Sequence, residues 1–420
     1  MEEVLKAKPE PSKLYRWGVL VFISLAMFGN YYVYDCVSPL ADLLAKQLNF
    51  TDSNIGLLQA IYSIPNVFMV LIGGIIIDRL GTRISTFIFA TLCLLGAIVT
   101  AMSSSLTFMA TGRLIFGLGA ESLIVAVTTV IGRWFKGKEL SFAFGVNLTI
   151  ARLGSFAALN SPTWGRSFYG SWQTPLLVAV AAGVISVAAV IIYITMDINA
   201  SKNYALREIP KQDEIKIKEI FNFKPSFWFI TFLCVTFYSA IFPFQTFAVK
   251  FFMDTHGTTR EFGGFLSSML TLSAMVLTPL FGLLSDYIGK RSLLMMFGSL
   301  LIIPVYLLMA YTSVSLFVPM AMMGISFSLV PAVMWPSVAI ITDESRLGTA
   351  YGLMTMIQNI GLFGFNMIIG WANDNSGGYT MGMWIFSSLG FFGLLFAYML
   401  RRNELGVGGH GLEEGTISKS

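Results

Sequence analysis

Long apolar segments separated by short polar stretches run along the whole chain. Each is close to or above the ~20 residues that a helix needs to cross the hydrocarbon core of a bilayer. Backbone groups in lipid must be hydrogen-bonded internally, so we expect these segments to be helices. The twelve predicted spans are Trp17–Leu44, Ser53–Ile77, Arg83–Met102, Leu106–Trp134, Leu140–Asn160, Trp172–Met196, Ser226–Phe252, Arg260–Leu284, Ser292–Tyr311, Ser315–Ile341, Gly348–Trp371 and Met381–Leu400.

The longest polar stretch, rich in Lys and Glu, separates the sixth span from the seventh. It predicts a division into two halves. We expect a six-helix bundle at 1–196, a cytoplasmic linker at 197–225, a second six-helix bundle at 226–400 and a cytoplasmic tail at 401–420.

Composition supports an all-α membrane protein and excludes several other classes. Only 12% of residues are charged, against roughly 25% in soluble domains, and mean hydropathy is +0.72. The three cysteines lie in apolar runs without metal-ligand spacing, and there are only two histidines. No nucleotide-binding glycine loop is present. We therefore expect no enzyme activity, no metal, no cofactor and no nucleic-acid partner.

The distribution of basic residues predicts the orientation. With a cytoplasmic N-terminus, 21 of the 27 Lys and Arg residues fall on the cytoplasmic side, three in outer loops and three within spans. By the positive-inside rule both termini are expected in the cytoplasm.

The two halves share a repeated loop. Gly74-x3-Asp78-Arg79-x-Gly81-x-Arg83 follows the second span, and Gly282-x3-Asp286-x2-Gly289-x-Arg291 follows the eighth, at a constant offset of 208. Parallel six-helix repeats are typical of one transporter fold. The loop and the repeat resemble the major facilitator superfamily over the whole chain, which implies twelve helices in two parallel repeats and alternating access.

Charged residues near the cytoplasmic ends of the helices suggest a conformational latch. Arg133, at the inner end of the fourth span, is a plausible partner for Asp78. We expect Asp78, Arg83, Asp286 and Arg291 of the two loops to form gating ion pairs; the alternative is a static set that only orients the protein.

A second ion pair is predicted between Asp35 and Arg113, whose depths in the first and fourth spans agree within a few ångströms. It would act as an outer gate or as a structural pair. A carboxylate within the membrane could instead be a site of proton coupling.

Glu121 and Arg152 stand alone near mid-membrane. Two opposite charges suit a substrate with an ammonium and a carboxylate group, because a guanidinium binds carboxylate in a bidentate manner. The alternative is that they pair only with each other, although a buried ion pair contributes little stability.

Polar and aromatic residues on the spans that line the path in the resembling fold complete the predicted cavity. Such aromatics can instead serve packing or face lipid. The predicted substrate-binding residues besides the charged pair are Trp335, Tyr62, Tyr238, Gln358 and Asn359, with Tyr31, Tyr32, Tyr34, Phe242 and Gln245 as further candidates.

Particular stretches resemble more closely the lysosomal dipeptide transporter family of that superfamily. The stretches include Gly112-Arg113-x2-Phe116-Gly117-x-Gly119-x-Glu121, Ala151-Arg152-x-Gly154-Ser155, Trp335-Pro336 and Ile357-Gln358-Asn359. The resemblance implies transport of short peptides, with Glu121 and Arg152 at charged substrate-binding positions and Trp335 as a cavity aromatic. The region before Trp17 lacks an acidic dileucine signal. We therefore expect a cell's inner (plasma) membrane, with a lysosome-like membrane as the alternative.

These observations predict a secondary carrier for small zwitterionic solutes, foremost dipeptides, acting in the bilayer as a monomer or homodimer. Facilitated diffusion and coupling to protons both stay open. The alternatives are an amino-acid permease with a smaller cavity, drug or metabolite efflux, against which Arg152 argues, and a non-transporting receptor with this fold.

Overall fold

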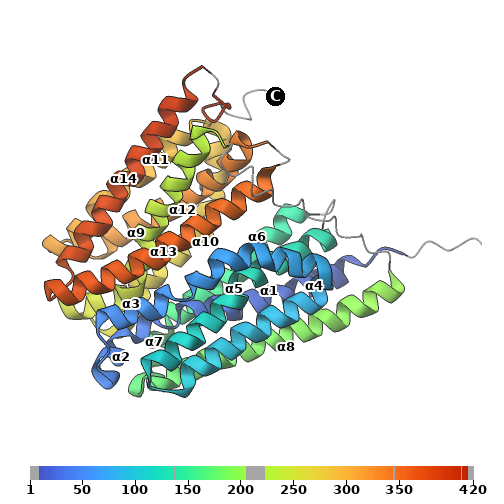
Figure 1. The fold of residues 1–420 in the computed structure, drawn as a ribbon, viewed down its shortest axis with the longest axis horizontal. Coiled ribbons are helices and arrows are strands. Elements are labelled where there is room, and N and C mark those ends of the chain that lie inside the picture. Colours follow the sequence, from blue (N-terminus) through green and yellow to red (C-terminus); the bar gives the residue numbers. More distant parts are fainter. Residues whose placement is uncertain (1–8, 136–138, 205–222, 344–345, 408, 415–420) are drawn as a thin grey trace, which may run out of the picture.

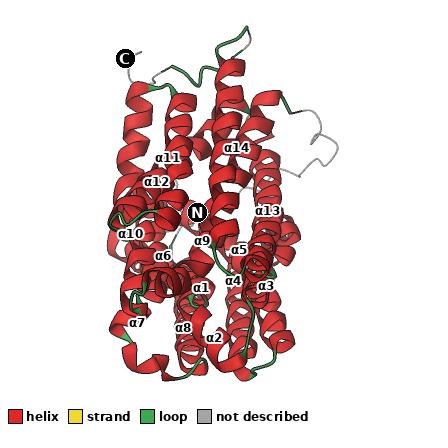
Figure 2. Ribbon diagram, turned by 90° about the vertical axis from the view of Figure 1, so that its left-hand side faces the viewer, coloured by secondary structure: helices red, strands yellow, loops and turns green. Residues whose placement is uncertain are grey.

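The computed structural model describes residues 9–135, 139–204, 223–343, 346–407 and 409–414. Every regular element in this part of the chain is a helix, and Figure 2 shows no strand among the described residues. Most of the predicted linker, at 205–222, lies outside the described residues.

The α-helices, with two short 3-10 helices, are α1 (Lys13–Asp35), η1 (Ser38–Leu40), α2 (Ala41–Leu48), α3 (Asp52–Ala60), α4 (Ser63–Met102), α5 (Leu106–Phe135), α6 (Leu140–Leu159), α7 (Ser161–Trp164), η2 (Arg166–Gly170), α8 (Gln173–Asn203), α9 (Pro225–His256), α10 (Arg260–Ile288), α11 (Arg291–Tyr311), α12 (Phe317–Ile341), α13 (Leu347–Ser376) and α14 (Thr380–Glu404).

Eleven helical segments of the described chain are long and apolar enough to cross a membrane. The predicted span Ser53–Ile77 is the twelfth, and the structure divides it between α3 and the first part of α4. The first span is also broken, because α1 ends at Asp35 and the chain continues through η1 into α2. Both breaks precede a proline, Pro39 or Pro65, that cannot donate a backbone hydrogen bond to the preceding turn.

The repeated loops supply a sharp turn in each half. Gly81 has φ +76° within α4, and its counterpart Gly289 has φ +65° after α10. A positive φ strains residues that carry a Cβ, which explains the glycine at both positions. The turn at Gly81 lets the 40 residues of α4 form two antiparallel spans.

Helices α1–α8 form the N-terminal half and α9–α14 the C-terminal half (Figure 1). We call the end of the bundle where α1 begins and α14 ends the terminal side, and the opposite end the distal side. The two halves approach each other on the distal side, where α3 packs against α13, and diverge toward the terminal side (Figure 1).

The tail after α14 packs back onto the C-terminal half. Leu412 is fully buried, and its carbonyl accepts from the Arg291 backbone N–H at 3.2 Å. The Glu413 carboxylate accepts from the Ser292 backbone N–H at 3.2 Å. A carboxylate at a helix N-terminus is stabilising, so this part of the tail caps α11.

Candidate functional site

A cavity of about 230 Å³ lies between the two halves. Its walls come from α1, α5, α6 and the turn between α3 and α4 on one side and from α9, α10, α12 and α13 on the other. The structure brings together all seven predicted substrate-binding residues in this wall, namely Tyr62, Glu121, Arg152, Tyr238, Trp335, Gln358 and Asn359. Helices far apart in the sequence therefore converge on one polar and aromatic chamber.

The Arg152 guanidinium lies between two aromatic rings. Its central carbon is 6.0 Å from the centroid of Tyr31 on α1 and 5.4 Å from that of Phe327 on α12. These distances are within the range of cation–π attraction. The cation is thus held in the cavity by one ring from each half.

Glu121 lines the same cavity from the middle of α5. Among the described residues, no cation approaches its carboxylate within 4 Å, and Arg152 forms no ion pair there with any carboxylate. The two charges therefore share a chamber without neutralising each other. A buried charge is costly unless it is paired, so both groups are suited to bind ions of opposite sign from a ligand.

Trp335 is fixed by two tyrosines. Its indole N–H donates to the Tyr238 hydroxyl at 2.9 Å, and the Tyr351 hydroxyl donates to its backbone carbonyl at 3.0 Å. The Tyr351 ring also stacks on the indole, with centroids 5.9 Å apart. This wall of the cavity is therefore held rigidly by α9 and α13.

Asn359 joins the halves in the middle of the bundle, since Asn66 on α4 donates to its side-chain oxygen at 3.5 Å. Gln358 accepts from the Cys234 thiol at 3.6 Å. Both amides are partly engaged, and both line the cavity.

The further candidates Tyr31, Tyr34, Phe242 and Gln245 also line the cavity, whereas Tyr32 is not in its wall and packs toward Trp164. Sequence reasoning missed Phe327. A signal was available: Phe327 lies eight residues before Trp335, and residues at that spacing share one face of a helix.

The predicted Asp35–Arg113 ion pair is wrong. Arg113 is 1% exposed and donates to the carbonyl groups of Val33 at 2.9 Å, Tyr34 at 3.2 Å and Leu58 at 3.2 Å. A fourth bond reaches the side-chain oxygen of Gln59 at 2.9 Å.

The helix breaks explain this arrangement. The last carbonyl groups of a helix lack partners within the helix, and those of α1 and α3 are buried here. Arg113 satisfies carbonyls at both ends and acts as a shared cap. Asp35 instead lines the cavity, with Ser155 beside its carboxyl group.

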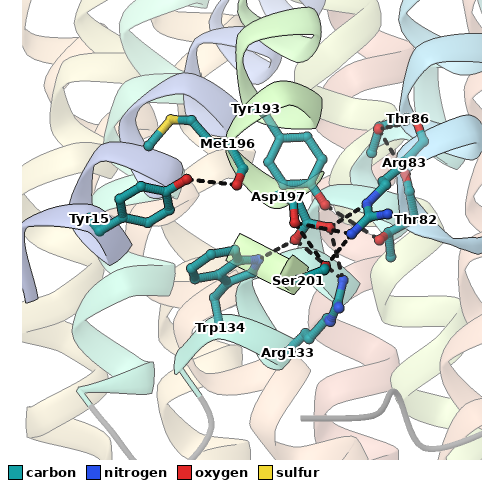
Figure 3. A network of polar contacts seen from close by, with 10 residues as sticks. All are labelled: Tyr15, Thr82, Arg83, Thr86, Arg133, Trp134, Tyr193, Met196, Asp197 and Ser201. Atoms are coloured by element: carbon teal, nitrogen blue, oxygen red, sulfur yellow. Dashed lines mark hydrogen bonds and ion pairs between the residues drawn. The ribbon is translucent and has the colours of Figure 1, made fainter. Parts of the chain in front are cut away.

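The predicted Asp78–Arg133 pair is also wrong. Arg133 and Arg83 both bind Asp197, which is fully buried near the end of α8, at 3.2 Å and 2.5 Å (Figure 3). The Trp134 indole donates to the same carboxylate at 3.0 Å. Asp78 is exposed and forms no ion pair with any described residue. The sequence predicted that Asp197 lies in the linker. Because α8 continues past Met196, Asp197 belongs to the N-terminal half instead.

The loop of the second half behaves differently. Arg291 is 3% exposed and binds Asp286 of its own loop, with Nη2 and Oδ1 2.6 Å apart. The repeated arginines Arg83 and Arg291 thus have partners of different origin, one from α8 and one from within the motif.

Known proteins share the sequence pattern and the fold of this chain. The sequence profile of the Major Facilitator Superfamily matches residues 23–251 and 227–416. The chain belongs to the major facilitator superfamily. It is 33% identical over 365 residues to a protein of Danio rerio named lysosomal dipeptide transporter MFSD1, covering 83% of this chain and 78% of the relative. Identity to the Homo sapiens protein of that name is 30% over 418 residues, covering 96% and 90%.

A solved structure supports the fold. The crystal structure of the nucleoside transporter NupG has a TM-score of 0.74 at 15% identity, covering 91% of this chain and 99% of that one. The protein is therefore a multi-pass membrane transporter of the major facilitator superfamily and not an enzyme.

In this superfamily member the distal side is the sealed side. Lys250 of α9 binds Asp52 of α3 at 2.6 Å, and Asp374 of α13 accepts from the Asp52 and Ser53 backbone N–H groups, each at 2.8 Å. Further ion pairs join Arg260 to Asp42 and Arg166 to Glu261. In the described chain, every ion pair between the halves lies on this side.

Close backbone contact completes the seal. A Cβ on Gly56 would lie 2.4 Å from the Asn366 carbonyl oxygen, and one on Gly370 would lie 2.5 Å from that of Asp52. Only glycine permits such an approach between α3 and α13. In the cavity wall, the rings of Tyr34 and Tyr62 meet edge to face with centroids 4.9 Å apart.

Proposed function

We propose that the protein is a secondary carrier that moves small zwitterionic solutes, foremost dipeptides, by alternating access. The observation that carries the proposal is the pair of uncompensated charges, Glu121 and Arg152, in one chamber at the interface of the halves. A dipeptide ammonium would bind the carboxylate, and its carboxylate would bind the guanidinium. The name of the relatives, lysosomal dipeptide transporter MFSD1, supports peptides as the substrate class.

The cycle follows from the distal seal. We propose that the terminal side is cytoplasmic, as the basic residues indicate, so the described state receives or releases substrate at the cytoplasm. Breaking the distal ion pairs and closing the terminal side would turn the site to the other side. The division of the chain into two bundles, a linker and a tail belongs to this proposal, with each half moving as a unit and with α8 extending the first bundle to Asn203. Which membrane it acts in is decided by imaging a tagged chain, since the relatives are named lysosomal.

Counterflow of a labelled dipeptide in proteoliposomes tests the proposal. We expect uptake by the parent protein and at least about tenfold weaker apparent affinity for Glu121→Gln and Arg152→Lys, because each loses a charge-assisted or bidentate contact. Asp343→Asn, on an exposed position at the terminal side, is the matched control. Transport by both site variants at the parent level would refute the assignment of the site. Repeating uptake with and without a pH gradient separates facilitated diffusion from proton coupling.

An amino-acid permease is the second candidate, and the modest volume of the cavity, about 230 Å³, favours it. Competition of the labelled dipeptide with single amino acids and with unlabelled dipeptides distinguishes the two. Inhibition by free amino acids at lower concentrations than by dipeptides would favour the permease.

A further inference from the structure

Helix α9 contributes to both the cavity and the distal seal, and a proline lies between the two contributions. Tyr238 lines the cavity before Pro243. Lys250, after the proline, binds Asp52 of the N-terminal half. Proline has no N–H group, so the carbonyl of Ser239 loses the donor that a regular helix supplies. The hydrogen bonds of α9 are therefore interrupted between the substrate chamber and the contacts that close the distal side.

The turn before the proline holds buried polar groups that the helix itself does not satisfy. The Ser239 hydroxyl is fully buried and has no hydrogen-bond partner among the described residues. Where a proline interrupts a membrane helix, neighbouring helices supply partners for the freed groups. Here α11 supplies one, because the Tyr306 hydroxyl donates to the Ala240 carbonyl at 2.6 Å. This bond ties the interrupted turn of α9 to another helix of the C-terminal half.

Tyr306 is held in place by two further rings. It is fully buried and is not part of the cavity wall. Its ring lies 5.4 Å from that of Phe244, which directly follows the proline, and 5.0 Å from that of Phe386 on α14. The rings of Phe244 and Phe386 are 5.9 Å apart. The three rings form one cluster beside the interruption, so the hydroxyl cannot turn away from α9 without breaking these contacts.

The part of α9 after the proline is joined to the distal seal. Ser38 of η1 donates to the Gln245 carbonyl. The Thr246 hydroxyl lies 3.0 Å from the side-chain oxygen of Asn366 on α13. The backbone carbonyl of Asn366 is the one that Gly56 approaches in the seal. The direction in which α9 leaves the proline therefore decides whether these contacts form.

We propose that Tyr306 is a positioning residue that holds α9 in the direction that closes the distal side, and that the turn from Ser239 to Pro243 is the hinge. When the bond to the Ala240 carbonyl breaks, the part of α9 after the proline turns away from the N-terminal half. The part before it stays packed in the C-terminal half. This inference rests on the proposed alternating access and not on the identity of the substrate.

Distances between spin labels test the hinge in a variant without native cysteines. A distal pair joins Thr255 at the end of α9 to Ser313 after α11, and a terminal pair joins Phe232 to Leu293 on the same two helices. All four positions are exposed. We expect Tyr306→Phe to raise the population with a displaced distal end of α9 about fivefold, since one buried hydrogen bond is lost. The terminal pair should not change.

Tyr311→Phe is the matched control, because it removes a hydroxyl from the same helix. The Tyr311 hydroxyl accepts from the Trp384 indole at 2.8 Å on the exposed surface and does not contact α9. Both distances should stay at the parent values in this variant.

Pro243→Ala decides whether the hydroxyl acts through the interruption. Alanine restores the N–H group that the Ser239 carbonyl lacks, so the direction of α9 no longer depends on Tyr306. A continuous α9 should move the distal pair and not the terminal pair. In this variant, adding Tyr306→Phe should change the population by less than about 1.5-fold, which a double-mutant cycle expresses as coupling between the two positions.

Three results would overturn the inference. They are an unchanged distal pair in Tyr306→Phe or in Pro243→Ala, an equal change in both pairs, and an equal effect of Tyr306→Phe with and without the proline. The distances need no substrate, so a failure of dipeptide counterflow does not alter them. Refutation of the hinge in turn leaves the charged site and the dipeptide proposal intact.

Discussion

Arg260, at the start of α10, holds Asp42 of α2 through two parallel hydrogen bonds, from Nε to Oδ1 at 3.0 Å and from Nη2 to Oδ2 at 2.5 Å. The pair crosses between the halves, and Asp42 is 2% exposed. Lysine keeps the charge but cannot form this fork. We expect Arg260→Lys to raise the population of the distal-open state about tenfold, as distances between spin labels on α2 and α10 would report.

The exchanged pair Asp42→Arg with Arg260→Asp is the control for this prediction. It should restore much of the parent distance distribution, because the attraction is kept with its direction reversed. Identical distributions for Arg260→Lys and the parent would show that the bidentate geometry does not hold the distal side closed.

Gly370→Ala should open the distal side without removing any charge, because its Cβ would lie 2.5 Å from the Asp52 carbonyl oxygen. Gly364 on the same helix has nothing within 4 Å of such a Cβ, so Gly364→Ala is the matched control. In a variant without native cysteines, the reactivity of Gln245→Cys reports how easily a thiol reagent reaches the cavity from the distal side. We expect a membrane-impermeant thiol reagent to modify it several times faster with Gly370→Ala than with Gly364→Ala. Equal rates would contradict the steric seal.

Asp197→Asn should destabilise the N-terminal half by about 3 kcal/mol, because it leaves Arg83 and Arg133 without their buried carboxylate. This is the lower end of the range for a broken buried pair, since the Arg83 side chain is 34% exposed and water takes over part of its solvation. Unfolding in detergent, followed by circular dichroism, measures the loss. Asp78→Asn, at an exposed position, should change stability by less than ~0.5 kcal/mol. A larger loss for Asp78→Asn than for Asp197→Asn would restore the latch predicted from the sequence.

Arg113→Lys should lower both stability and transport, although the charge is retained. An ammonium cannot reach the three carbonyl groups and the Gln59 oxygen that the guanidinium binds together. We expect a loss of about 2 kcal/mol in unfolding free energy and a weaker apparent substrate affinity, since Tyr34 and Tyr62 flank the capped breaks. Arg79→Lys, at an exposed position, is the control. Parent-like affinity in Arg113→Lys would show that the cap does not position the cavity wall.

The architecture could be predicted because it follows from patterns along the chain, and the cavity wall because the resembling fold indicates which spans line the path. Apolar length predicts the spans, and the offset between Gly81 and Gly289 predicts the repeat. Glu121 and Arg152 stand out because few charges occur at mid-membrane, and the family resemblance also indicated both as substrate-binding positions.

The partners of the other charges could not be predicted, because depth says nothing about the direction in which a side chain points. Arg113 and Asp35 share a depth, yet the breaks after α1 and α3 offer Arg113 several acceptors that lack partners within their helices. Pro39 and Pro65 mark those breaks in the sequence. The segments around both prolines are apolar, however, so hydropathy predicts a continuous span in each case. Asp197 was assigned to a linker because hydropathy ends the sixth span too early.

Two kinds of contact in the distal seal respond differently to ionic strength. Salt at 1 M shortens the screening length to ~3 Å and weakens the partly exposed pairs, such as Arg166 with Glu261. The contacts of Gly56 and Gly370 join uncharged backbone groups and are indifferent to salt. Concentrated salt should therefore weaken the ion pairs at the edge of the seal while α3 and α13 stay in contact through their glycines.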